Sequence, residues 1–224
     1  MLRLRRWLWR RRTADAECRE FLAASYPSPR SDWRSARFLA LDLESTGLDP
    51  RRDQIISVGW VALEQGEIPV GQAAHYLVRG EAGVGQSAAF HLITDSARAE
   101  GSPIDCVLRA MLRAAAGRVI VAHHAPVERG FLDAACRRIF GIPFLAPVVD
   151  TLALERRRFA LRGAQPGAGE LRLGACRRRY GLPDYPVHDA LSDALAAGEL
   201  MLAQAAHIAG DGRLGVGSLI AMSQ

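Results

Sequence analysis

Residues 38–48 read FLALDLESTGL, and this stretch indicates both the fold and the chemistry of the chain. An apolar run of this length predicts a buried, central strand. Side chains alternate across a strand, so Asp42 and Glu44 point to one face, while Leu41 and Leu43 point to the other. Two adjacent anions repel each other unless a cation neutralises them, and oxygen ligands suit Mg²⁺ or Mn²⁺. The stretch therefore predicts a divalent-metal site; two solvated acids at a polar strand end are the alternative.

The composition bounds the class of protein. The chain has 224 residues, 49% of them hydrophobic, and a formal net charge of +5, which suits one domain with a full core. All of the basic residues are Arg, and there is no Lys or Asn, a pattern typical of a GC-rich genome, so the charge favours a polyanionic partner only weakly. The sequence contains no run of ~18 apolar residues, so no transmembrane segment is predicted. The scattered cysteines lack a C-x-x-C motif and indicate a reduced, cytoplasmic protein without structural zinc.

The first 36 residues differ from the rest of the chain. Met1–Arg12 carries six Arg interleaved with two Trp and three Leu, and Arg interrupts every apolar stretch, so no signal peptide is expected. A short helix is predicted over 14–24, with an apolar side formed by Cys18, Phe21 and Leu22. Pro27 and Pro29 then break it. We interpret residues 1–36 as a basic extension and linker that contacts nucleic acid or an anionic membrane surface, or else is a disordered leader.

The remaining chain alternates between strands and helices. A meander of three strands is predicted first, over 38–43, 54–63 and 73–78. The strands that follow are predicted over 118–122 and 147–149, and the helices over 105–115, 126–140, 171–180 and 189–208. This order predicts an α/β domain over 37–210, in which helices pack on the faces of a mixed sheet. Residues 211–224 are expected to form a C-terminal tail.

A second candidate site follows the strand predicted at 118–122. From His123 the chain reads HHAPVERGFL. Glu128 precedes Phe131 and Leu132 by three and four residues, so it lies on the apolar, sheet-facing side of its helix. It also occupies the first turn, where the helix dipole favours a carboxylate. A carboxylate that only stabilises the dipole is the alternative.

The final predicted helix begins in the segment VHDALSDALAAGEL, residues 187–200. Asp193 shares its helix face with Ala190, Ala194 and Ala197. Small residues allow a helix to approach a sheet closely, which would bring Asp193 to the acids of the first strand. His188 lies just before the helix, on a loop. The alternative is an acid pair at a helix N-terminus with a capping His.

The combined pattern resembles the DEDDh 3′–5′ exonuclease family, which includes the DNA polymerase III epsilon proofreading subunit, RNase T, oligoribonuclease and the TREX enzymes. The resemblance covers residues 37 to about 206, and the stretches 39–63 and 187–200 carry most of it. It implies a ribonuclease-H-like fold with a mixed five-stranded sheet flanked by helices. By motif position, it implies two Mg²⁺ or Mn²⁺ ions and a general base, His188. The implied metal ligands are Asp42, Glu44, Glu128 and Asp193.

The resemblance also implies a substrate site and a reaction. Backbone groups around Ser45, Thr46 and Gly47 would hold the terminal nucleotide, and Leu48 would pack on its base. The implied reaction is metal-dependent hydrolysis at the 3′ end of single-stranded DNA, in replication or repair, which releases nucleoside 5′-monophosphates. A 3′–5′ exoribonuclease or oligonucleotidase and a catalytically weakened nucleic-acid-binding module are the alternatives. The implied partner is a single-stranded 3′ end; no protein partner is predicted.

Two residues depart from the pattern of that family. Its middle motif usually has Asn and, four residues later, Asp, where this chain has His124 and Glu128. Glu keeps the charge and adds one methylene, and a shift of ~1 Å in geometry is expensive for catalysis. His124 either contacts substrate or caps a helix. Asp150 is expected to be the N-cap of the next helix, and His91–Thr94 resembles a family segment beside the active site, although a core or surface role is expected here.

Overall fold

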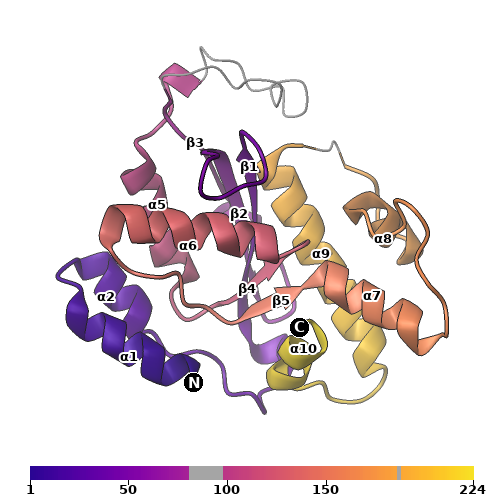
Figure 1. Cartoon of the computed structure of the whole chain (residues 1–224). Helices are drawn as coiled ribbons and strands as arrows, with labels where there is room; N and C mark the ends of the chain where they lie inside the picture. Colours follow the sequence, from indigo (N-terminus) through magenta and orange to yellow (C-terminus); the bar gives the residue numbers. More distant parts are fainter. Residues whose placement is uncertain (81–97, 186–187) are drawn as a thin grey trace.

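The structure, a computed structural model of the chain, describes residues 1–80, 98–185 and 188–224. Within these residues, a five-stranded mixed sheet lies between two layers of helices (Figure 1). The strands are β1 (Arg37–Ser45), β2 (Ile55–Glu64), β3 (Ala74–Leu77), β4 (Val119–Ala122) and β5 (Val148–Asp150). Their order is β3-β2-β1-β4-β5; β1, β2 and β3 pair antiparallel, whereas β4 is parallel to both β1 and β5. The predicted α/β fold is therefore confirmed, while His91–Thr94 lies outside the described residues.

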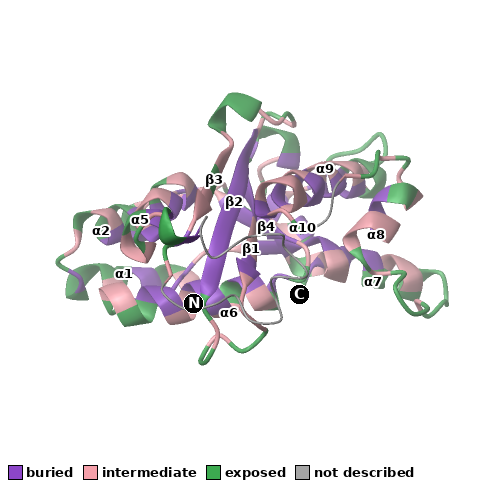
Figure 2. Ribbon diagram, turned by 90° about the horizontal axis from the view of Figure 1, so that it is seen from above, coloured by how far each residue is buried: buried purple, intermediate pink, exposed green. Residues whose placement is uncertain are grey.

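Helices cover both faces of the sheet. On one face lie α1 (Leu2–Arg12), α2 (Ala16–Ala23), α5 (Ile104–Ala115) and α6 (Pro126–Phe140). The opposite layer contains α7 (Thr151–Leu161), α8 (Leu173–Arg179), α9 (Ala190–Ala209) and α10 (Val216–Met222). Figure 2 shows the buried strands between these layers, with the exposed residues on the outer sides of the helices. Among the described helices, none has the length and apolar content needed to cross a membrane.

The alternation of side chains along β1 explains why both of its faces are buried. Leu39 and Leu41 belong to the core that the sheet shares with α5 and α6. Phe38 and Ala40 belong to the core on the α9 side. Because residues i and i+2 share a face, Asp42 and Glu44 lie on the α9 side of the sheet.

Close packing brings the N-terminus of α9 onto the sheet. Gly59 of β2 is the register partner of Asp42. A Cβ atom at Gly59 would lie 2.3 Å from the backbone of Ala190 and Leu191, so only glycine permits this approach. The three alanines that share the face of Asp193 are all buried. The predicted close contact of this helix with the sheet is confirmed.

The N-terminal segment is folded against the domain. The predicted helix over 14–24 is confirmed as α2, whose three apolar residues are buried in the same core as α5. Residues 2–12 form α1, which packs on α2, so the interpretation of this segment as a disordered leader is wrong. A domain division at residue 36 stays a prediction.

The segment expected as a C-terminal tail carries α10. Val216 and Leu219 are buried in the core on the α9 side. The backbone N–H of Trp33 donates a hydrogen bond to Leu214 O, and that of Val216 donates to Ser31 O. The stretch that precedes β1 and the C-terminal segment therefore hold each other in place.

Candidate active site

Three of the predicted carboxylates lie together at the end of β1. Asp42 and Glu44 come from the strand and Asp193 from the first turn of α9, and one carboxylate oxygen of each lies within 4.8 Å of the others. Burial raises the pKa of Asp42 well above its ordinary value, and neighbouring carboxylates, Glu128 foremost, raise it further. Burial, with the charge of Asp193, raises the pKa of Glu44 to about 7. Such mutual repulsion is relieved by a cation, so this donor set fits a hard divalent metal.

Glu128, the fourth predicted carboxylate, lies in the opposite layer of helices; it is not part of the group within 4.8 Å, but its charge acts on Asp42. It lies in the first turn of α6, as predicted, and is only 7% exposed. Burial raises its pKa to about 8, and the charge of Asp150 adds to the effect. Its Oε2 atom is buried without a hydrogen-bond partner among the residues that the structure describes. Buried carboxylate oxygens are rarely left unpaired, so this atom is a fitting ligand for a cation.

His188 lies beside Asp193, immediately before α9. Its backbone adopts the left-handed region, with φ at +66°, and its N–H donates a hydrogen bond of 2.9 Å to Asp193 Oδ2. Burial raises the pKa of Asp193 above its ordinary value. The hydrogen bond from His188 and the charge of that residue act in the opposite direction but are outweighed. The N-cap of α9 is Asp189, which accepts from Ser192 N, so His188 is not the capping residue.

An arginine that the sequence analysis missed supports the segment before His188. Arg177 of α8 is 1% exposed, and it donates hydrogen bonds to Ala196 O at 2.7 Å and to Pro183 O at 2.8 Å. It also pairs with Glu199 at 2.7 Å, and Glu199 accepts a bond from the Tyr185 hydroxyl. Arg177 therefore ties residues 183–185 to α9. The sequence offers no signal for it, because Arg177 is the first of three consecutive arginines.

Residues 45–48, at the end of β1, are held by side-chain hydrogen bonds. Ser45 Oγ donates to Gly47 O at 2.6 Å, and Thr46 Oγ1 donates to Asp53 Oδ1 at 3.2 Å. A Cβ at Gly47 would lie 2.5 Å from Asp53 Oδ2, so the carboxylate packs directly on this glycine. Leu48 is 82% exposed. An exposed apolar side chain on the loop that follows β1 suits the predicted contact with a base, which stays a prediction.

Asp150 and His124 lie next to each other, and the charge of Asp150 acts on Glu128. Asp150 accepts hydrogen bonds from the N–H groups of Leu152, at 2.9 Å, and of His124, at 3.0 Å. It is the N-cap of α7, as predicted, and it also fixes the turn between β4 and α6. His124 is exposed, its φ is +78°, and α6 has no side-chain cap. The capping alternative for His124 is therefore wrong.

Comparison with known proteins identifies sequence relatives. A model of the exonuclease family RNase T matches residues 39–201. The DNA polymerase III subunit epsilon-like protein of Rhodobacter capsulatus is 34% identical over 169 residues, 74% of this chain and 23% of that protein. The PolC-type DNA polymerase III of Thermotoga petrophila is 30% identical over 173 residues, 77% of this chain and 12% of that protein. The chain thus spans less than a quarter of either relative.

Solved structures share the fold. Exonuclease X in complex with 5′ overhanging duplex DNA has a TM-score of 0.62 and 21% identity, over 84% of this chain and 99% of that one. E. coli exonuclease I in complex with a dA16 oligonucleotide has a TM-score of 0.64 and 15% identity, over 75% of this chain and 40% of that one. At these identities the likeness concerns the fold, and it confirms the predicted ribonuclease-H-like architecture.

Proposed function

Because the chain belongs to the RNase T exonuclease family, we propose that it removes nucleotides from the 3′ end of single-stranded DNA and releases nucleoside 5′-monophosphates. The observation that carries this proposal is the group formed by Asp42, Glu44 and Asp193, in which one carboxylate oxygen of each residue lies within 4.8 Å of the others. The solved exonucleases with this fold include complexes with DNA, which supports DNA over RNA as the substrate. The four free cysteines support a reducing, cytoplasmic location as part of the proposal.

Asp42, Glu44, Asp193 and Glu128 would hold the divalent cations, Mg²⁺ or Mn²⁺. When bound there, such ions polarise a phosphodiester and lower the pKa of a water molecule. Other residues of the chain would transfer the proton and orient the substrate. His188, exposed beside Asp193, would accept the proton of the attacking water. The backbone of residues 45–47 would orient the terminal nucleotide, with Leu48 against its base.

An assay with strands labelled at the 5′ end tests the proposal. The full chain should shorten a single-stranded 30-nucleotide DNA one nucleotide at a time with Mg²⁺ or Mn²⁺, and should leave it intact in EDTA. Asp42→Asn and Asp193→Asn should each lower the rate by roughly 10³-fold or more, whereas Asp211→Asn, an exposed acid, should not. Faster shortening of the matching RNA would reassign the substrate. Full activity of Asp42→Asn or Asp193→Asn would refute the site.

A further inference from the structure

One buried arginine fixes α1 to the rest of the protein. Arg6 is 4% exposed, and its guanidinium donates hydrogen bonds to Leu145 O at 2.5 Å and to Ala24 O at 3.1 Å. It also lies 4.4 Å from the centre of the Tyr26 ring. Carbonyl oxygens and an aromatic face thus surround this charge. The exposed arginines of α1 therefore have a defined position relative to α6.

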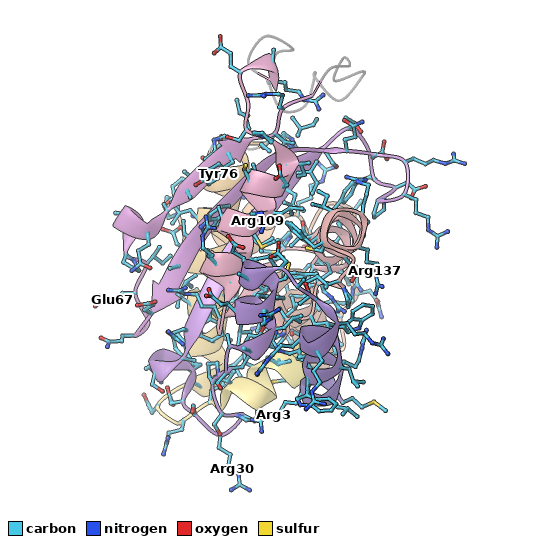
Figure 3. All side chains as sticks on the ribbon, turned by 90° about the vertical axis from the view of Figure 1, so that its left-hand side faces the viewer. Arg3, Arg30, Glu67, Tyr76, Arg109 and Arg137 are labelled. Carbon is cyan, nitrogen blue, oxygen red and sulfur yellow. The ribbon has the colours of Figure 1, made fainter. Side chains whose placement is uncertain are left out.

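Two neighbouring hollows share a lining of arginines. The first, of about 400 Å³, lies between α1 and α6 and is lined by Arg5, Arg129 and Arg137. The second, of about 550 Å³, extends from α6 to α7 and is lined by Arg129, Arg156 and Arg157. Arg129 lines both, so the two hollows adjoin. We call Arg5, Arg129, Arg137, Arg156 and Arg157 the arginine band; Figure 3 shows Arg137 beside α6, at the outer edge of the molecule.

The band carries an excess of positive charge. All five side chains are exposed. Within residues 1–80, 98–185 and 188–224, the only ion pair that the band forms joins Arg137 to Asp133 at 2.6 Å. Asp150, the other acid in the lining, is occupied by backbone N–H groups. Guanidinium groups match phosphate in geometry as well as in charge, so the free members of the band are suited to a polyphosphate chain.

The second hollow adjoins the candidate active site. His124 and Asp150 line it, and the charge of Asp150 acts on Glu128. Arg5, at the far end of the band, belongs to a helix outside residues 39–201, the part that the exonuclease family model matches. The band therefore extends from the hollow lined by His124 and Asp150 to a helix outside the part that the family model matches.

We propose that the arginine band binds the phosphates of a nucleic-acid strand upstream of the 3′-terminal nucleotide, and so holds substrates longer than the active site itself accommodates. This inference rests on the proposed function, because it takes the strand to end at the carboxylate cluster. The concave lining favours a strand over an anionic membrane, since a flat bilayer cannot enter two hollows. Binding by the band depends on charge and not on base sequence.

Equilibrium binding of single-stranded DNA in EDTA tests the band without cleavage. The full chain and its Arg129→Gln variant are compared with Arg138→Gln, which changes another exposed Arg of α6 that lines neither hollow. For a 30-nucleotide strand, Arg129→Gln should weaken binding by roughly 3- to 10-fold at low salt and reduce the slope of log K against log salt by ~0.7. A 4-nucleotide strand should show a smaller loss, and Arg138→Gln should keep the slope of the parent chain.

The outcomes separate this inference from the proposed function. Hydrolysis of the p-nitrophenyl ester of thymidine 5′-monophosphate by the unsubstituted chain with Mn²⁺ reports the active site alone, because the ester carries a single phosphate. If the ester is hydrolysed but Arg129→Gln and Arg138→Gln have equal salt slopes for strand binding, the proposed role of the band is wrong and the proposed function is not affected. Anionic vesicles that bind the parent chain but not Arg129→Gln, with strand binding unaltered, would also overturn it. If neither the ester nor any strand is hydrolysed, the proposed function itself is wrong.

Discussion

Replacing Glu128 with Gln tests the electrostatics of the site. Burial raises the pKa of this carboxyl from an ordinary 4.5 to about 8, so the folded, metal-free protein holds the proton more tightly than the unfolded chain does. Between pH 4.5 and pH 8 the folded state therefore binds more protons, and the free energy of unfolding falls as the pH rises. Below this window both states are protonated, and above it both are ionised. We expect the metal-free chain to lose stability from pH 5 towards pH 8.

The size of the loss follows from the shift in pKa. One pKa unit corresponds to ~1.4 kcal/mol, and linkage applied to Glu128 gives a loss on the order of 2 kcal/mol between pH 5 and pH 7. In urea this lowers the unfolding midpoint by roughly 1 M. Glu128→Gln removes the titrating group and should lack this part of the pH dependence. Glu44, whose pKa burial raises to about 7, titrates in the same direction in both proteins. The difference between the two proteins therefore reports the ionisation of Glu128 together with the effect of its charge on Asp42.

The assay is urea unfolding in EDTA at pH 5, 6, 7 and 8, with Glu20→Gln as a control for loss of an exposed carboxylate. The control should follow the parent chain, while Glu128→Gln should show the flatter profile. Adding Mn²⁺ at pH 7 should stabilise the parent chain more than Glu128→Gln, because the variant lacks one anionic ligand. Superimposable pH profiles of the parent and Glu128→Gln would refute the reasoning, since the carboxyl would then titrate alike in the folded and unfolded states.

Two further predictions concern the geometry around the cluster. His188→Ala should lower kcat by roughly 10²-fold or more, with little change in substrate affinity, and should change how the rate depends on pH; an unchanged pH profile would assign the proton transfer to another group. Gly59→Ala should destabilise the fold by ~1–3 kcal/mol in urea unfolding, because its Cβ would lie 2.3 Å from the backbone of α9, and should lower activity by displacing Asp193. Gly71→Ala, with nothing within 4 Å of the added atom, is the matched control and should be nearly neutral.

Local signals were sufficient to predict the elements that position the site. The predicted and observed bounds of α6 coincide, because Pro126 suits the first turn and Gly141 adopts the left-handed conformation at its end. The shared face of Asp42 and Glu44 follows from the period of a strand, and the small residues around Asp193 indicated its close packing. These features depend on neighbours in the sequence, so the sequence alone carries them.

The features that could not be predicted depend on contacts between distant segments. The α10 segment is rich in glycine, and it is fixed by pairing with the residues before β1 and by the burial of Val216. Arg6 has the same surroundings in the sequence as its exposed neighbours, and it differs from them through contacts with distant groups such as Leu145 O and the Tyr26 ring. Arg177 likewise differs from the arginines beside it through its contacts with α9. Periodicity cannot single out such residues.

Glu128 keeps the negative charge that the family pattern has at this position, but it places the carboxylate on a side chain that is one methylene longer. Asp193 reaches the strand acids because α9 lies directly on Gly59, so a short side chain suffices there. Glu128 extends from the opposite layer with a longer side chain, and its charge is the foremost of the neighbouring charges that raise the pKa of Asp42. Its Oε2 finds no partner among the described protein groups. The departure from the family pattern therefore preserves repulsion at Asp42 and leaves one buried carboxylate oxygen for a cation to satisfy.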